Sequence, residues 1–325
     1  MARADLLVSL VRAANRGDEA LFQRTVEALI ADERSKHHNV LADRLEESLR
    51  RNGSSAAVLA SRSTEPSSSP FLLTVEPRKR MEDLILPNAV AKASQELIEE
   101  QHRVDLLRSY NLEPRNRVLL VGPPGNGKTS LAEAIAEGLM MPMLVVRYES
   151  LIGSYLGETA SRLKQLFDFV RTRRGVLFLD EFETLGKERG DEHETGEIKR
   201  VVSSLLLQVD ALPAHVVVIA ATNHPELLDR AVWRRFQLRL TLPKPNSAQR
   251  TEWFRRFERQ LGRSLGLTPA SLAERLKSAS FSELEDFTTD VQRRCVLSEP
   301  NADAKRIVRE LLKYWKPRPF SSAKA

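Results

Sequence analysis

Cysteine is almost absent from this chain of 325 residues, and long apolar runs are missing altogether. With Cys295 as the only thiol, neither an internal disulfide nor a cysteine metal cluster can form, and we expect a buried side chain in a reducing compartment. No stretch approaches the roughly 18 consecutive apolar residues that span a bilayer. Arg3 and Asp5 interrupt the apolar N-terminus, unlike the core of a signal peptide. The sequence therefore predicts a cytoplasmic protein with no membrane partner.

Aromatic residues are also few where the chain is most basic. The formal net charge is +6, but acidic residues alternate with basic ones almost everywhere. The short basic runs 77–80 and 171–174 contain no aromatics among their basic residues that could stack on nucleic-acid bases. We interpret these charges as solvated surface, and we do not expect nucleic acid as a partner.

Composition divides the chain into four parts. Residues 1–52 have apolar side chains near a 3.6-residue period, which predicts short amphipathic helices that either dock a partner or cap the main domain. Residues 53–77 are rich in Ser, Ala and Pro and are expected to form a flexible linker, part of which could lie extended on the main domain. Residues 78–245 are expected to form an α/β subdomain, and 246–325 a helical subdomain with a C-terminal tail.

Apolar, β-rich runs separated by helical segments favour a parallel sheet that is covered on both faces. The runs expected to form strands are 118–121, 143–146, 176–179, 216–219 and 238–242. The predicted fold class is therefore α/β.

The strongest motif is the glycine-rich loop at residues 122–129, which follows the first of these runs and opens a helical segment. Glycines allow the backbone to wrap around phosphates, Lys128 can reach the β- and γ-phosphates, and the Thr129 hydroxyl can bind Mg²⁺. The sequence therefore predicts a site for ATP and Mg²⁺. The residues expected to bind the nucleotide are Pro123, Pro124, Gly125, Asn126, Gly127, Lys128, Thr129 and Ser130, together with Asp180.

Two further motifs follow later strands. Asp180 and Glu181 end an apolar run, where an open α/β sheet binds its ligands; Asp180 is expected to hold Mg²⁺ and Glu181 to activate water. Taken alone, such a pair is usually a solvated strand end, but its spacing from the glycine-rich loop favours catalysis. Asn223 is expected to orient the attacking water, although it could also cap a helix before Pro225.

Adjacent arginines, Arg234 and Arg235, form the last catalytic candidate. Either could reach the phosphates in a neighbouring subunit, as an arginine finger does. This interpretation predicts a homo-oligomer; the alternative is a pair of surface arginines without such a role.

Together these residues resemble the AAA+ family, and within it the AAA subgroup that includes microtubule-severing and membrane-anchored proteolytic ATPases. The resemblance extends over about residues 87–287. It implies a five-stranded parallel sheet with a helical lid, ATP hydrolysis and assembly as a hexamer. It also assigns residues 112–116 to the adenine side of the site. In the lid, residues 280–285 depart from the family pattern, which leaves the sensor-two contacts open.

Residues 154–159 and 220–236 are most similar to small bacterial AAA ATPases that are often encoded beside a subtilisin-like serine protease. The resemblance therefore suggests such a protease as a partner, held through residues 1–52. The chain has no His-Glu-x-x-His zinc motif of its own.

Tyr155 occupies the position of the aromatic that family members place in the central channel. An aromatic between Gly153 and Gly157 can grip an extended chain, or it can simply pack on the subunit face. We therefore expect an oligomeric ATPase that remodels or unfolds a protein client. The alternatives are a nucleotide-dependent binding module that regulates a protease or other effector, and, less favoured, a nucleic-acid motor.

Overall fold

The computed structural model divides the chain into two units, 1–67 and 68–325. It describes Thr25 and Ala28 in the first unit and residues 69–151, 156–185, 195–298, 300 and 302–315 in the second. Among the helices of these described residues, none has both the length and the apolar character needed to cross a membrane.

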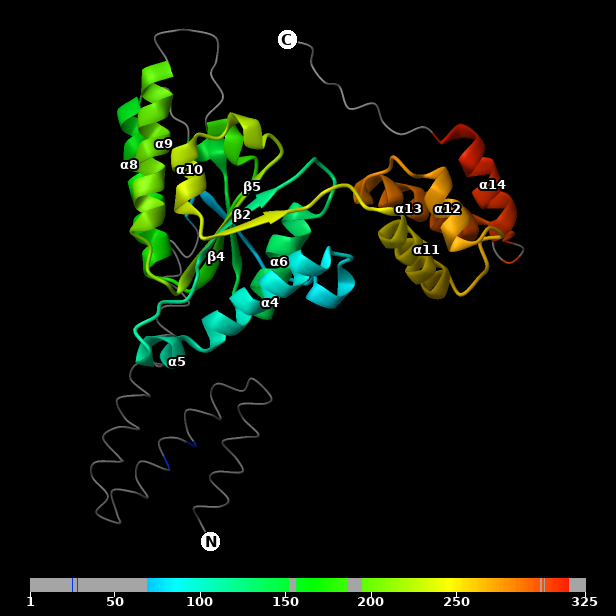
Figure 1. Ribbon diagram of the computed structural model, residues 1–325, viewed down its shortest axis with the longest axis horizontal. Helices are drawn as coiled ribbons and strands as arrows, with labels where there is room; N and C mark the ends of the chain where they lie inside the picture. The colour runs from blue at the N-terminus through cyan, green and yellow to red at the C-terminus, as the bar shows by residue number, and fades with distance from the viewer. Residues whose placement is uncertain are drawn as a thin grey trace. The chain divides into compact units, whose positions relative to one another are not determined.

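A six-stranded sheet forms the centre of the second unit, in the spatial order β1-β3-β4-β5-β2-β6 (Figure 1). The five expected strands are all present and pair in parallel. The strands are β1 (Leu72–Val75), β2 (Arg117–Val121), β3 (Met143–Val146), β4 (Gly175–Leu179), β5 (Val216–Thr222) and β6 (Leu238–Thr241).

The last part of the predicted linker 53–77 contains strand β1, so this part lies extended on the main domain, which was the alternative left open by the sequence. Leu72–Val75 pairs antiparallel with β3, so that Leu72 lies opposite Val146 and Val75 opposite Met143. The physical reason is local: Phe71 and Leu72 are almost fully buried, and their backbone pairs with the open edge of β3. The rest of the expected linker that precedes residue 69 lies outside the described residues.

Helices cover both faces of the sheet, which explains why its strands are continuously apolar. Helices α8 and α9 lie on one face and α4 and α6 on the other (Figure 1). Within β5, Val216 and Val218 belong to one core cluster, and Val217 and Ile219 to the other. The helices and 3-10 turns of this α/β part are η1 (Met81–Asp83), α4 (Asn88–His102), α5 (Val104–Ser109), α6 (Lys128–Gly138), α7 (Tyr148–Leu151), α8 (Leu156–Arg171), η2 (Phe182–Leu185), α9 (Thr195–Asp210), η3 (Pro225–Leu227) and α10 (Arg230–Arg235).

The helices after β6 have a core of their own, around Phe254, Phe287 and Val308. Capping boxes start two of them: Asn246 pairs with Gln249, and Ser280 with Glu283. Cys295 is 3% exposed and packs in this core, so its expected burial is confirmed. These lid helices are α11 (Ser247–Leu261), α12 (Pro269–Arg275), α13 (Phe281–Leu297) and α14 (Ala304–Tyr314).

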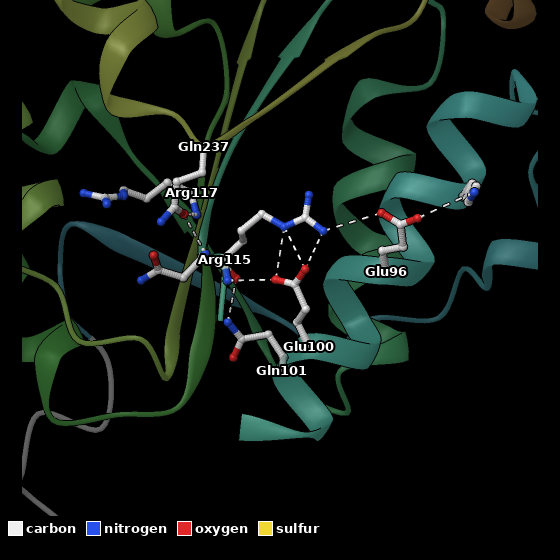
Figure 2. A network of polar contacts seen from close by, with 8 residues as sticks. Glu96, Glu100, Gln101, Arg115, Arg117 and Gln237 are labelled. Atoms are coloured by element: carbon white, nitrogen blue, oxygen red, sulfur yellow. Dashed lines mark hydrogen bonds and ion pairs between the residues drawn. The ribbon is translucent and has the colours of Figure 1, made fainter. Parts of the chain in front are cut away.

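Arg115 joins helix α4 to the residues that lead into β2 (Figure 2). Its Nε donates to Oε1 of Glu100 at 2.9 Å, and its backbone N–H donates to Oε2 at 3.0 Å. Its Nη2 also lies 3.5 Å from Oε2 of Glu96. Burial alone would raise the pKa of Glu100, but the hydrogen bonds and charge of Arg115 hold that pKa below its ordinary value.

We expect Glu100→Gln to lower the free energy of unfolding by about 1 kcal/mol at neutral pH, because it removes a charge-assisted pair that is only partly shielded from water. Since the folded pKa of Glu100 is lowered, its contribution is present above the ordinary value of 4.5 and is lost as the pH falls through the folded pKa. Denaturant titrations should therefore show that the free energies of unfolding of the wild type and Glu100→Gln differ at neutral pH and become equal in acid.

Glu99→Gln is the matched control on the same helix. Glu99 pairs with Arg103, and both side chains are more than 60% exposed, so we expect a change below about 0.5 kcal/mol. An equal loss for both variants, or a Glu100→Gln effect that persists in acid, would contradict this account.

Candidate functional site

A cavity of about 510 Å³ at the carboxyl ends of β2, β4 and β5 is the main candidate site among the described residues. Parallel strands bring the loops that follow them to one edge of the sheet, which is where such folds bind ligands. The cavity is lined by Lys79, Asp83, Leu84, Ile85, Leu86, residues 124–130, Asp180, Glu181, Asn223, Trp253, Phe281, Ser282 and Glu285. Most of the residues expected from the sequence to bind nucleotide therefore lie around one space.

The loop after β2 approaches the backbone too closely for any side chain at Gly122. A Cβ there would lie 2.1 Å from the carbonyl oxygen of Leu242, and φ is +155°. At the other end of the loop, Gly127 has φ +85° and immediately precedes α6, but a Cβ there would meet nothing within 4 Å. The loop thus follows β2 directly and turns into the N-terminus of a helix, an arrangement that binds phosphate groups.

Lys128 is 6% exposed and directs its ammonium into this loop. Its Nζ donates to the carbonyl oxygens of Gly122 at 2.7 Å and Pro123 at 3.1 Å, and to Oδ1 of Asn223 at 2.6 Å. Burial holds the pKa of Lys128 below its ordinary value, against the opposing charges of Asp180 and Glu183. Asn223 thus faces the lysine, and the alternative role of capping a helix before Pro225 is not observed, because His224 is the residue at that N-cap position.

Thr129 and Asp180 meet across the cavity, although they are far apart in the sequence. The Thr129 hydroxyl donates to Oδ2 of Asp180 at 3.1 Å. A hydroxyl and a carboxylate oxygen at this separation are ligands of the kind that Mg²⁺ prefers, so the donor set fits that ion.

Glu181 adopts a backbone conformation that is rare for its residue type. Its φ is +45°, in the left-handed region, and its backbone N–H donates to Oδ1 of Asp180 at 2.9 Å. Its side chain is exposed and lines the cavity. The strained turn separates two adjacent carboxylates, one tied to Thr129 and one open to the cavity.

Glu183 is a site residue that sequence reasoning missed. It is 3% exposed, and its Oε1 accepts the backbone N–H of Asn223 at 3.1 Å. The available signal was a third carboxylate two residues after Glu181, directly after the apolar Phe182.

Residues 112–116, which were expected on the adenine side of the site, do not line the cavity. Asn116 instead donates to the carbonyl oxygen of Val216, at the start of β5. The apolar wall is formed by Leu84, Ile85 and Leu86, and by the lid residues Trp253 and Phe281, whose ring centroids are 5.7 Å apart. No motif marked these residues, because their proximity arises only in the folded chain.

The lid contacts the site directly. The backbone N–H of Ser282, at the start of α13, donates to the carbonyl oxygen of Gly125 at 2.9 Å. From α11, Nη1 of Arg256 donates to the carbonyl oxygens of Glu82 at 3.0 Å and Asp83 at 3.2 Å. A movement of the lid would therefore change both the glycine-rich loop and the residues leading into the apolar wall.

Comparison with known proteins agrees with this geometry. Residues 118–244 match the model of the ATPase family associated with various cellular activities (AAA). Over 302 residues the chain is 34% identical to an uncharacterized AAA family ATPase of Sinorhizobium fredii, covering 91% of this chain and 90% of that protein. The chain belongs to the AAA family of ATPases.

A more distant relative of this AAA ATPase is proteasome-activating nucleotidase 1 of Haloferax volcanii. The two are 31% identical over 195 residues, which cover 58% of this chain and 48% of the nucleotidase. Among solved structures, the crystal structure of the FIGL-1 AAA domain superimposes with a TM-score of 0.60, at 23% identity, covering 77% of this chain and 87% of that one. The second likeness concerns the fold alone.

The two arginines of the AAA ATPase differ in their surroundings. Arg235 forms an ion pair with Asp210, whose other oxygen accepts from Nη1 of Arg117 at 2.7 Å. Arg234 is exposed, and no hydrogen bond or ion pair joins it to the described residues. Both lie near the amino ends of β2 and β6, so neither lines the cavity of its own chain. Tyr155 lies outside the described residues.

Substituting two glycines of the loop distinguishes the stability lost to a steric overlap from the stability lost to a left-handed backbone conformation. We expect Gly122→Ala to lower the free energy of unfolding by about 3 kcal/mol or more, because its Cβ would overlap a backbone oxygen that cannot move aside. Gly127→Ala is the control: it adds only the cost of a left-handed conformation, about 1 kcal/mol. Thermal unfolding of both variants without nucleotide tests this order, and equal losses would contradict it.

Proposed function

We propose that this AAA ATPase hydrolyses ATP in the cavity between the glycine-rich loop and the lid. The observation that carries the proposal is the convergence of distant motifs: Lys128 Nζ lies 2.6 Å from Asn223 Oδ1, and Thr129 Oγ1 lies 3.1 Å from Asp180 Oδ2. These contacts bring together the residues that would bind phosphate, hold a metal ion and orient water. A glycine-rich turn without a nucleotide-binding role would not require these side chains from β4 and β5 beside it.

In this mechanism the loop amides and the N-terminus of α6 attract the phosphates, and Lys128 exchanges its carbonyl partners for phosphate oxygens. The exposed Glu181 accepts a proton from the attacking water as the bond to the γ-phosphorus forms and ADP leaves. Asn223, held through its backbone by Glu183, orients that water. Thr129 and Asp180 would hold Mg²⁺, which when bound supplies positive charge opposite the phosphate oxygens.

We further propose that the active form is a homo-oligomer, with a hexamer as the expected ring. Arg234 supports this proposal, because it is exposed, has no partner among the described residues and lies at the edge of the sheet away from its own cavity. Arg235 is held by Asp210 within the chain. Of the two arginines, Arg234 is therefore the better candidate to reach a neighbouring subunit's γ-phosphate.

The ATPase proposal is tested by measuring ATP turnover and assembly mass, with and without ATP, for the wild type and two variants. Glu181→Gln should bind ATP but turn it over at least about 100-fold more slowly, because the water loses its base. Arg234→Ala should retain ATP affinity and lose about 1,000-fold in turnover.

Arg235→Ala is the matched control for the adjacent position. We expect it to lower thermal stability more than turnover, because it breaks the pair with Asp210. Full turnover by a monomer carrying Arg234→Ala would rule out catalysis across subunits.

We propose that hydrolysis drives the remodelling or unfolding of a protein client. One support is the relative whose name describes it as activating the proteasome, a protein-degrading particle. The other is Tyr155, whose sequence position between two glycines favours a channel aromatic.

Tyr155→Ala should therefore keep ATP turnover but lose the ability to unfold a green fluorescent protein that carries an unstructured tail. Tyr155→Phe keeps the aromatic ring and should remain active, which makes it the control. Unfolding at the wild-type rate by the alanine variant would show that the aromatic does not grip the client.

A subtilisin-like protease or another effector, docked on residues 1–52, stays a prediction from the sequence. Apart from Thr25 and Ala28, that segment lies outside the described residues.

A further inference from the structure

The hydroxyl of Tyr148 is buried beside the site and is not used by the mechanism above. Tyr148 is the first residue of α7 and directly follows the short segment after β3. Its ring packs against the core on the α8 and α9 side of the sheet. Its hydroxyl oxygen is buried and has no hydrogen-bond partner among the described residues. A buried donor of this kind is costly unless it finds an acceptor.

The register of the sheet brings Tyr148 to the catalytic carboxylates. Strands β3 and β4 are parallel, and Val145 lies opposite Phe178. Tyr148 is three residues beyond Val145, and Glu181 is three residues beyond Phe178, so both leave the sheet at the same level. The charges of Asp180, Glu183 and Glu181 act on the phenol: burial raises the pKa of Tyr148, and these carboxylates raise it further.

Glu183 supplies a matching acceptor. Its Oε1 accepts from the backbone of Asn223, but its buried Oε2 has no hydrogen-bond partner among the described residues. Glu183 thus presents a free acceptor oxygen, and Tyr148 presents a free donor, in the same carboxylate-rich region. We propose that during ATP turnover the Tyr148 hydroxyl donates a hydrogen bond to Oε2 of Glu183, directly or through one water molecule.

This bond makes Tyr148 a positioning residue that acts through two others. Glu183 holds the backbone N–H of Asn223 at 3.1 Å, and Oδ1 of Asn223 accepts from Lys128 Nζ at 2.6 Å. A carboxylate anchored at only one oxygen can rotate about its side-chain torsions, whereas one anchored at both is fixed. Tyr148 therefore stabilises the orientation of Asn223, and through it the lysine that contacts the phosphates.

The inference rests on the proposed ATPase function, and a double-mutant cycle tests it separately. Tyr148→Phe removes the hydroxyl and keeps the ring, so we expect kcat for ATP to fall about fivefold or more, with KM within about twofold of the wild type. The thermal midpoint should be unchanged or higher, because a buried hydroxyl is lost while the packing remains. Tyr110→Phe is the control, since Tyr110 is 73% exposed at the end of α5.

Glu183→Ala removes the acceptor and should also lower kcat more than it raises KM. In that background Tyr148→Phe should have no further effect, because the partner is already gone. The proposal would be overturned if the losses of kcat caused by the two substitutions multiply in the double variant. It would also be overturned if Tyr148→Phe has the kcat of the wild type, or if its loss of kcat is accompanied by a lowered thermal midpoint. If instead the wild type itself does not hydrolyse ATP, the proposed function fails rather than the role of Tyr148.

Discussion

Parallel pairing of β2 with β5, and of β5 with β4, is the constraint on which the site depends. These strands run in one direction with both faces buried, so their following loops all emerge at one edge. The glycine-rich loop follows β2, Asp180 and Glu181 follow β4, and Asn223 follows β5. The hydrogen bond from Lys128 to Asn223 then joins the first of these loops to the last. Any shift in the register of these strands would move the three loops apart and break the hydrogen bonds between them.

The same sheet gives the chain a second edge with different chemistry. At the amino ends of β2 and β6, Asp210 is shared by Arg117 and Arg235, which confines one of the two adjacent arginines to a role within the subunit. Arg234 is left exposed on the same short helix. The proposed completion of the site by a neighbouring chain requires the two halves of the site on different faces of one chain, and the separation of the two sheet edges is compatible with that arrangement.

The lid adds a second wall to the cavity. Its contacts with the α/β part include backbone groups, at Gly125 and at Glu82 and Asp83, and each of these positions adjoins the cavity. The contact from Ser282 to Gly125 joins backbone to backbone, so it depends on where α13 begins, and the cap at Ser280 sets that position. The contacts at Glu82 and Asp83 are made by the side chain of Arg256 instead, so lid orientation and cavity shape are linked both through a helix start and through one arginine.

Local sequence determined the parallel strands, the glycine-rich loop, the acidic pair and the separate helical lid. Each depends on neighbours within a few residues: apolar runs of strand length, glycines at positive φ, or capping pairs three residues apart. Tertiary structure alone decided the antiparallel strand at Leu72–Val75, the apolar wall at residues 84–86, and the partners of Glu183 and Arg235. Those features join residues that are tens of positions apart, and periodicity carries no information about which distant groups will meet. Tyr148 shows the difference most clearly: in the sequence it is an ordinary tyrosine after a strand, and only the register of β3 on β4 brings it to the level of Glu181.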